Sequence, residues 1–498
     1  MKPTRIWSDT QWMRGLIIGM LAASTMLVGA CRDNAAHDLV LNAAGTAATV
    51  ITVDSPAAIA QESAADYNNN VNGLITAKTL KSWIDDWPAN RPAGITGRLV
   101  ILQINNGPTG QEYITPHPAT GVVTYSVVDT SRLIETRSDG VAQIKAMVPD
   151  GPTMDRFFHD YGIDPTKDML VWVMGTGGYL PNMWMGRGWY MMRYWGVPKT
   201  HLALLDGGAF YGMPSYMGGT ASCDENVSTS CLPDNGTFSV RNLPEDNTAL
   251  QATLEDMMHI VRPTDVNDLH DGVFIWDARN IGQYSAGLID ESGGVPANYM
   301  TEFQNGGSQQ GHPNGALDLN FTNMLDSATG YSYKPKSELQ AYLDGRVDAN
   351  GKGFTDGTLQ PVGPGRAYQS GDTVYTYCET TFRAMITGIV SGVILDKPTR
   401  FYDGAMYEWH TMSNIVAKNG LPLLPIDSPW RTDLTNRSYF RPADSAAAVT
   451  TRVITDPYAI SADAIVRADQ EYKRGVGGGS SSGGGALPPP PNPCANAG

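Results

Sequence analysis

The sequence predicts an α/β protein in which one parallel-sheet unit occurs twice. Short apolar runs alternate with stretches compatible with helices, and the same order of these elements is found in both halves of the chain. Such alternation is typical of a parallel sheet covered by helices, and a repeated order indicates an internal duplication. With 498 residues, of which 42% are hydrophobic, the chain is long enough for two such domains and further segments.

The first copy is predicted within residues 73–220. Its elements are a strand at 99–102, a helix near 154–161, a strand at 169–173, a glycine-rich loop, a helix at 188–195 and a strand at 204–205. The glycine-rich loop begins at Met174 and contains no cysteine. We expect this loop to be several residues longer than its counterpart in the second copy.

The second copy is predicted within residues 256–415. Its elements are a strand at 272–277, a helix at 337–343, a strand at 373–377, a helical run at 382–395 and a strand at 400–402. The strand at 373–377 is followed directly by Cys378, at the place where the first copy has its glycine-rich loop.

Residues 1–30 have the pattern of a secretory signal, with a basic start, an apolar run at 16–30 and small residues at its end. The apolar run is short for a membrane span, which needs about 20 residues. Its end, together with Cys31, resembles a bacterial lipobox, which implies cleavage before Cys31 and lipid attachment to its sulfur. Arg32 in the next position resembles an outer-membrane sorting signal. The expected location is therefore the bacterial cell envelope, lipid-anchored at the outer membrane with its face left open; ordinary secretion with an incidental cysteine is the alternative.

The segments outside the two copies are predicted to be connections and tails. They are a tether at 31–72, an inter-domain linker at 221–255, a C-terminal extension at 416–473 and a flexible Gly/Ser/Pro-rich tail at 474–498. The extension either wraps the second copy or faces a partner. Cys494 in the tail is interpreted as a free or incidentally paired thiol, with an intermolecular disulfide as the alternative.

Composition excludes several classes of protein. A net charge of −15 argues against a nucleic-acid partner, because neutralising phosphates requires clustered Lys and Arg. Five cysteines are too few for a disulfide scaffold. No nucleotide-binding or haem-attachment motif is present, so we expect no cofactor.

Two further clusters have a structural and a chemical interpretation. Cys223 and Cys231 lie on a polar stretch of an exported chain, which favours a disulfide over a redox-active dithiol or a zinc site. A group of methionines in the first copy favours core packing over a Cu(I) site, so no metal is expected; it comprises Met183, Met185, Met191 and Met192.

The second copy also carries a set of motifs that resembles the tandem rhodaneses, the thiosulfate and 3-mercaptopyruvate sulfurtransferases. The motifs are Asp277-x-Arg279, Tyr284, Gly311-His312-Pro313-x-Gly315-Ala316, Tyr377-Cys378, Tyr402-Asp403-Gly404 and Glu408-Trp409. The resemblance implies two rhodanese-like domains, a catalytically silent first one and a second one with Cys378 as nucleophile. His312, Asp277 and Asp403 are expected to orient loops rather than to react.

The resemblance implies sulfur transfer through a persulfide on Cys378. The donor is expected to be a small sulfur-containing anion, and the acceptor a thiol or a cyanide-like nucleophile. A cysteine between a strand and a helix N-terminus suits this chemistry, because the helix end carries roughly half a positive charge and favours a thiolate.

The expected substrate-binding residues are Arg279, Arg383 and the loop residues Glu379, Thr380, Thr381 and Phe382. The loop departs from the family pattern at two positions. Glu379 is acidic and is expected to raise the pKa of the thiol if its side chain points inward. Thr381 stands where most members have glycine, which permits a positive φ.

Two other functions remain open at this point. The chain is alternatively a non-catalytic rhodanese-like lipoprotein that binds or assembles an envelope redox complex. A weaker alternative is reduction of another chalcogen oxyanion or of a peroxide by the same thiol. An inert Cys378 would favour the binding protein, and an isolable persulfide would favour the sulfurtransferase.

Overall fold

The computed structural model describes residues 51–105, 112–127, 130–225, 228–286, 289, 311–409, 417–421, 423–425, 427–431, 455–456 and 458–475. The chain divides into two compact units, residues 1–53 and residues 54–498. The described part of the first unit contains the short strand β1 (Thr52–Val53). Both predicted copies lie in the second unit.

Each copy contains a five-stranded parallel sheet. The first sheet has the order β2 (Gly73–Ile75), β9 (Leu202–Leu205), β8 (Met169–Val173), β3 (Leu99–Gln103) and β5 (Val122–Ser126). The second has the order β12 (Gln251–Ala252), β18 (Thr399–Tyr402), β17 (Thr373–Tyr377), β13 (Val273–Asp277) and β14 (Leu317–Asp318). Strand β12 lies in the segment expected to be linker.

The two sheets share one topology. When the strands of each sheet are numbered along the chain, both orders read 1-5-4-2-3. Strands β3 and β8 are buried along their whole length, as expected for parallel strands covered by helices on both faces. The predicted fold class, a duplicated α/β unit with parallel sheets, is therefore confirmed.

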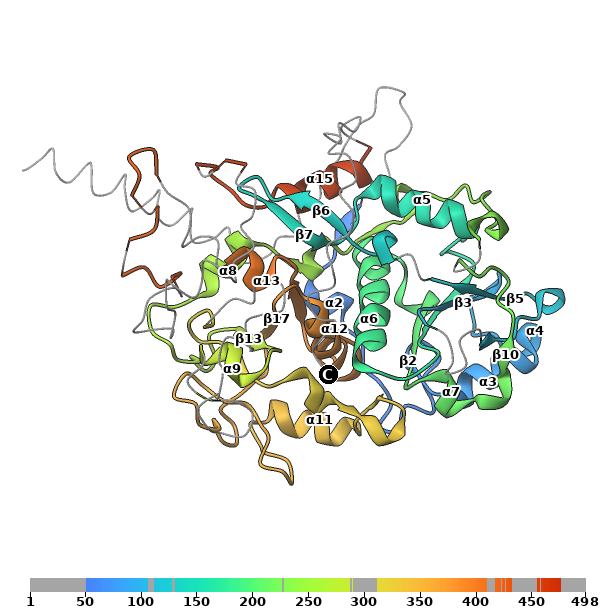
Figure 1. Ribbon diagram of the computed structural model, residues 1–498, viewed down its shortest axis with the longest axis horizontal. Coiled ribbons are helices and arrows are strands. Elements are labelled where there is room, and N and C mark those ends of the chain that lie inside the picture. The colour runs from blue at the N-terminus through green and yellow to red at the C-terminus, as the bar shows by residue number, and fades with distance from the viewer. Residues whose placement is uncertain are drawn as a thin grey trace, which may run out of the picture. The chain divides into compact units, whose positions relative to one another are not determined.

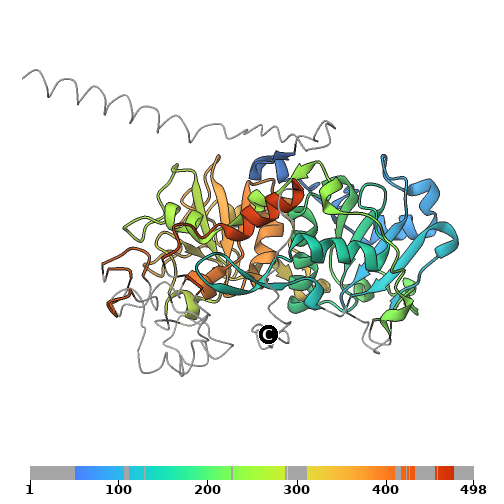
Figure 2. The same cartoon turned by 90° about the horizontal axis from the view of Figure 1, so that it is seen from above.

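Two long helices lie between the sheets. Helix α6 (Tyr179–Tyr194) belongs to the first copy, and α12 (Phe382–Ile389), which continues as a π-helical turn at Val390–Ile394, belongs to the second. They pack side by side (Figure 1), and Gly186 permits this approach because a Cβ there would lie 2.8 Å from that of Met385. In Figure 2 the blue-to-green first copy and the yellow-to-orange second copy lie on either side of this pair.

Shorter elements complete the two copies. Other helices are α2 (Pro56–Ile59), α3 (Ala77–Asp85), α4 (Trp87–Asn90), α5 (Gly151–Tyr161), α7 (Ala209–Gly212), α8 (Leu254–Ile260), α9 (Ile281–Tyr284), α11 (Lys336–Leu343), α13 (Ala405–Trp409) and α15 (Ala464–Lys473). Other strands are β4 (Tyr113–Ile114), β6 (Glu135–Ser138), β7 (Gln143–Met147), β10 (Met217–Gly219), β11 (Glu245–Asp246), β15 (Leu325–Asp326) and β16 (Ser332–Tyr333). No helix among the described residues is long and apolar enough to cross a membrane.

The loop of the first copy is shorter than the sequence indicates. Helix α6 begins at Tyr179 rather than at 188, so the loop covers only 174–178. The corresponding loop of the second copy covers 378–381. The helix accommodates Pro181 in its first turn, where a missing N–H is tolerated. Gly188 lies against the Trp172 ring, where no Cβ would fit.

The prediction of a tether up to residue 72 is wrong for residues 54–72, which pack against the second copy. The backbone N–H of Gln61 donates to the Gly392 carbonyl at 2.9 Å, and that of Ser63 donates to the Ile394 carbonyl at 3.2 Å. The Tyr67 side chain is 5% exposed and its hydroxyl donates to the Lys334 carbonyl. The Ala-, Asn- and Ser-rich composition gave no sign of this packing, because backbone groups supply several of the contacts.

The C-terminal extension also has an unexpected position. Helix α15 packs on α5 and β6 of the first copy (Figure 1), although the sequence left only the second copy or a partner as choices. Its Asp469 is 1% exposed and accepts two hydrogen bonds from Arg137, at 2.6 and 2.7 Å, and one from the Tyr194 hydroxyl at 2.7 Å. Helix α15 is therefore fastened to the first copy, which is the more distant of the two copies in the sequence.

A hairpin of the second copy covers the carboxyl edge of the first sheet. Strands β15 and β16 form this hairpin, in which the Gly330 carbonyl accepts a hydrogen bond from Gly208. The Tyr333 N–H donates to the Asp206 carboxylate at 2.8 Å. The Gly330 backbone also lies directly against Gly177, within the cysteine-free loop of the first copy.

Asp206 gives this edge a pH dependence, because burial raises its pKa to about 7. Its folded-state pKa lies above the unfolded value, so the stability it contributes is present below about pH 4 and is lost as the pH rises to about 7. We expect Asp206→Asn to gain about 1–3 kcal/mol over the wild type at pH 8 and little at pH 4, because an amide oxygen still accepts from Tyr333. Urea unfolding at both pH values measures this; an equal change at both would contradict it.

Candidate functional site

Cys378 lies at the carboxyl end of β17, the central strand of the second sheet. It is a free cysteine with an exposed fraction of 0%. The loop 378–381 connects β17 to the N-terminus of α12. Its carbonyls are fixed by α13, because Met406 N–H donates to the Cys378 oxygen at 3.2 Å and Tyr407 N–H donates to the Glu379 oxygen at 3.1 Å.

Thr381 confirms that this loop needs an unusual backbone conformation. Its φ is +65°, in the left-handed region that glycine adopts without cost and a β-branched residue adopts with strain. The Thr381 hydroxyl compensates by donating to the carbonyls of Tyr402 at 2.8 Å and Asp403 at 3.0 Å. A side-chain hydroxyl therefore holds the left-handed backbone of the loop in place.

The Thr381 hydroxyl is testable by an isosteric change. We expect Thr381→Val to lose about 1–2 kcal/mol of unfolding free energy, because two buried carbonyls lose a donor while the strain remains. Thr381→Ser keeps the hydroxyl and should stay closer to the wild type. Equal unfolding midpoints for the valine variant and the wild type would show that the hydroxyl does not hold the loop.

Arg279 is fully buried and bound to carboxylates. Its Nη2 lies 2.6 Å from Asp277 Oδ2, and its Nε donates to the same carboxylate at 2.9 Å. Burial disfavours the charge, but the Asp277 carboxylate outweighs this effect and places the pKa of Arg279 above its ordinary value. The Tyr377 hydroxyl also donates to Asp277, at 2.8 Å.

Glu379 faces Arg279. The Glu379 side chain is buried, and its Oε2 lies 3.9 Å from Arg279 Nη1. Glu379 and Asp277 are thus two carboxylates that face the same guanidinium, that of Arg279. The structure therefore brings Arg279 and Glu379 together.

The other predicted loop residues are nearly buried as well. Arg383 donates from Nη1 to the Gln283 side chain at 2.7 Å, which joins α12 to α9. Phe382 packs edge-on against Trp184 of α6, with 4.6 Å between ring centroids. The Thr380 hydroxyl is buried and finds no hydrogen-bond partner within the described residues. An unsatisfied hydroxyl beside Cys378 is a candidate contact for a bound substrate.

His312 orients its loop, as expected. Its Nε2 lies 3.0 Å from Asp265 Oδ2, and its ring stacks on Tyr284 with centroids 3.6 Å apart. Burial lowers the pKa of His312, whereas the Asp265 carboxylate raises it, and the net pKa lies above the ordinary value. Asp403 is likewise a loop-orienting residue, through contacts described below.

Cys223 and Cys231 form the expected disulfide, with 5.2 Å between their Cα atoms. The segment that it closes lies along the edge strand β5, because the Ser126 N–H donates to the Cys223 carbonyl at 3.0 Å. The methionine group of the first copy is core, each member being at most 1% exposed. Cys31 and Cys494 lie outside the described residues.

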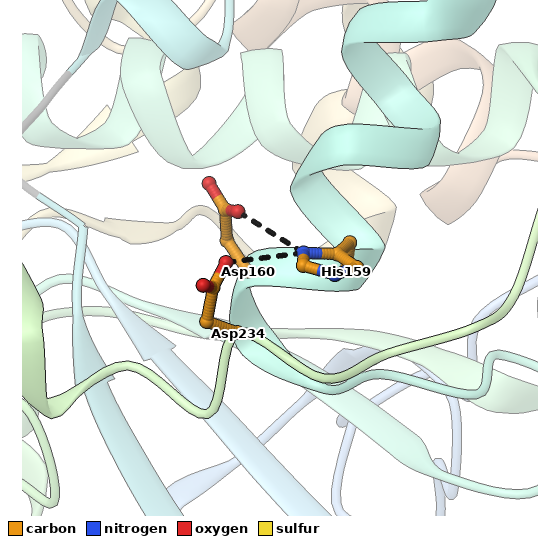
Figure 3. A group of neighbouring side chains, drawn as sticks. All are labelled: His159, Asp160 and Asp234. Atoms are coloured by element: carbon orange, nitrogen blue, oxygen red, sulfur yellow. Dashed lines mark ion pairs between the residues drawn. The ribbon is translucent and has the colours of Figure 1, made fainter.

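A cluster elsewhere has the composition of a metal site but not its electrostatics. His159, Asp160 and Asp234 converge at the end of α5 (Figure 3), with His159 Nδ1 3.5 Å from Asp160 and 3.2 Å from Asp234. Asp160 is already paired with Arg132 at 2.8 Å and with Arg156 at 2.5 Å. Two guanidinium groups on one carboxylate repel a cation, so the group is an ion-pair network.

Sequence reasoning missed one residue of this region, Arg187 of the first copy. It is 0% exposed and paired with Asp403, which follows β18 of the second copy. A signal was present, because Arg187 is the one charged residue between Tyr179 and Tyr190, a stretch that is otherwise apolar or glycine apart from Asn182. A buried charge in such a helix predicts a buried partner.

Comparison with known proteins found similar chains among solved structures. No protein-family model and no curated protein sequence matches the chain. Among solved structures, it is similar to the Tum1 protein from Saccharomyces cerevisiae, with 14% identity, a TM-score of 0.43 and coverage of 68% of this chain and 95% of that one. It is also similar to SseA from Escherichia coli, described by the rhodanese fold and the mechanism of 3-mercaptopyruvate sulfotransferases, with 18% identity, a TM-score of 0.39 and coverage of 67% and 98%.

A third similar structure is the 3-mercaptopyruvate sulfurtransferase from Leishmania major, with 12% identity, a TM-score of 0.40 and coverage of 68% of this chain and 74% of that one. All three of these structures are at most 18% identical to the chain. Their likeness concerns the fold, and the activity of this chain rests on its own residues.

Proposed function

We propose that the chain is a sulfurtransferase that carries a sulfane sulfur as a persulfide on Cys378. The observation that carries the proposal is a free cysteine between the end of the central strand β17 and the start of α12. Backbone N–H groups in the first turn of a helix have no helical acceptor, so they favour a thiolate and a bound anion at this place. Strain at Thr381, within the same loop, is also typical of a functional site.

The reaction has two displacements. The Cys378 thiolate attacks the outer sulfur of the donor; a sulfur–sulfur bond forms at Cys378, and the donor's bond to that sulfur breaks, its electron pair leaving with the anion. With thiosulfate the leaving anion is sulfite. An acceptor thiolate or cyanide then attacks the outer sulfur of the persulfide, and Cys378 leaves as thiolate.

The loop and two arginines would bind the donor. The Thr380 hydroxyl is unsatisfied within the described residues and is available to a donor oxygen. Arg279 and Arg383 supply positive charge, and Phe382 closes the loop against α6. A donor anion that approaches Arg279 meets Glu379 at the same guanidinium, so Glu379 sets how strongly an anion is bound.

We also propose that the protein is held at the bacterial envelope by lipid on Cys31. The support is the sequence pattern of residues 1–31. Intact mass of the membrane-extracted protein is the test. A mass matching the chain from Cys31 with added acyl groups supports the anchor, and a chain cleaved elsewhere without lipid contradicts it.

Sulfur transfer is tested by intact mass of the full chain after incubation with thiosulfate and, separately, with mercaptopyruvate. We expect a gain of one sulfur atom in the wild type and none in Cys378→Ser. Gain with one donor identifies it. Absence of gain with both, together with no labelling of Cys378 by iodoacetamide, would refute the enzyme and favour a non-catalytic partner-binding protein.

A further inference from the structure

An ion pair links the silent copy to the loop of the active one. Arg187 of α6 and Asp403 after β18 are both 0% exposed in their side chains. Arg187 Nη1 donates to Asp403 Oδ1, and Nη2 donates to Oδ2 at 3.0 Å. Nη2 also donates to the Ala146 carbonyl at 2.6 Å, and the Val148 N–H donates to Asp403 Oδ2 at 2.7 Å. Both carboxylate oxygens are thus held by groups of the first copy.

The backbone around Asp403 holds the Cys378 loop at both ends. The Asp403 carbonyl accepts from the Thr381 hydroxyl at 3.0 Å, at the end of the loop that enters α12. Three residues further on, the Met406 N–H donates to the carbonyl of Cys378 itself at 3.2 Å. A displacement of Asp403 is therefore transmitted to Cys378 itself and to the end of its loop.

Stability alone does not account for this arrangement. A buried ion pair is often no more stabilising than apolar residues of the same size, because desolvation offsets the attraction. The neighbours of Arg187 in α6 are apolar or glycine, so an apolar residue would suit the helix. The pair instead fixes geometry, because a bidentate guanidinium sets both the position and the orientation of the carboxylate that it binds.

We propose that Arg187 is a positioning residue for the Cys378 loop, acting through Asp403. The inference rests on the proposed sulfur transfer and assigns the silent copy a part in it. The first copy supplies no nucleophile, but its α6 fixes the segment that shapes the loop and so directs the N–H groups of α12 at the thiol. Loss of the pair leaves the loop in place but loosely held.

The test compares Arg187→Lys and Asp403→Asn with a matched pair that does not touch the loop. Arg137 and Asp469 are also a buried Arg–Asp pair between distant segments, with 2.6 Å between their atoms, so Arg137→Lys and Asp469→Asn are the controls. Two measurements are made on each full-length variant. One is amide hydrogen exchange of residues 378–384, and the other is the pH midpoint of iodoacetamide labelling of Cys378.

We expect Arg187→Lys and Asp403→Asn to exchange at least tenfold faster at residues 378–384 and to shift the labelling midpoint upward by about one pH unit, because a loose loop stabilises the thiolate less. The controls should lower the urea midpoint of unfolding without either effect. If Asp403→Asn does not fold, Arg187→Lys decides.

The outcomes separate this inference from the proposed function. Exchange and labelling midpoints equal to the wild type in Arg187→Lys overturn the positioning role, as do equal effects in the controls. A wild-type Cys378 that is not labelled at any pH refutes the sulfurtransferase, and the exchange rates then still decide whether Arg187 holds the loop.

Discussion

Asp469→Ala is expected to lose about 3–5 kcal/mol of unfolding free energy, because the change leaves the buried Arg137 without its carboxylate. Arg137 holds both oxygens of Asp469, and its side chain is 9% exposed. The Tyr194 hydroxyl loses its acceptor in the same variant. Urea unfolding measures the loss, and limited proteolysis should release the C-terminal segment before the rest of the chain unfolds.

Arg467→Ala on the same helix is the matched control. Arg467 pairs with Asp463 at 3.6 Å, but its side chain is 59% exposed, so we expect a change below about 1 kcal/mol. If both variants unfold at the same urea concentration, the buried network does not fasten α15.

Glu379→Gln is expected to lower the KM for thiosulfate about tenfold, because the donor anion then competes for Arg279 with one carboxylate instead of two. The Glu379 oxygen lies 3.9 Å from Arg279, and Asp277 remains to keep the arginine compensated in the free protein. The rate of persulfide formation at saturating thiosulfate should change less than KM. Stopped-flow measurement of persulfide formation against thiosulfate concentration gives both quantities.

Glu338→Gln on α11 is the control for a general effect of net charge on KM, because Glu338 is exposed. It pairs with Lys334 at the surface, and Glu338→Gln removes one negative charge far along the chain from the loop. A KM that falls equally in both variants would show a general charge effect. A KM unchanged in Glu379→Gln would show that the donor does not reach Arg279.

The strands of both sheets and the place of Cys378 could be predicted from the sequence because their signals are local. Apolar runs such as 169–173 and 373–377 mark buried strands whatever surrounds them. Thr381 was identified as an unusual residue at a glycine position, and its positive φ follows from the same local requirement.

What could not be predicted depends on contacts between distant residues. The partner of Arg187 is 216 residues away, and no spacing rule connects them. Residues 54–72 resembled a tether because they are rich in Ala, Asn and Ser and show little periodicity, although the Ser63 hydroxyl is buried against the Val393 carbonyl. Glu379 was interpreted as a charge beside a thiol, whereas its pairing with Arg279 emerges only when β13 and β17 lie side by side.

Residues 54–72 and helix α15 each pack on the copy that is more distant from them in the sequence. Residues 54–72 precede the first sheet but bond to the π-helical turn at Val390–Ile394, and α15 follows the second sheet but packs on the first copy. Neither half can complete its packing while the other is missing. Until residues near 473 have left the ribosome, the first copy lacks α15 and the partner of its Arg137. We therefore expect this chain to depend on chaperones during synthesis, and a gene fragment encoding one copy to yield aggregated product.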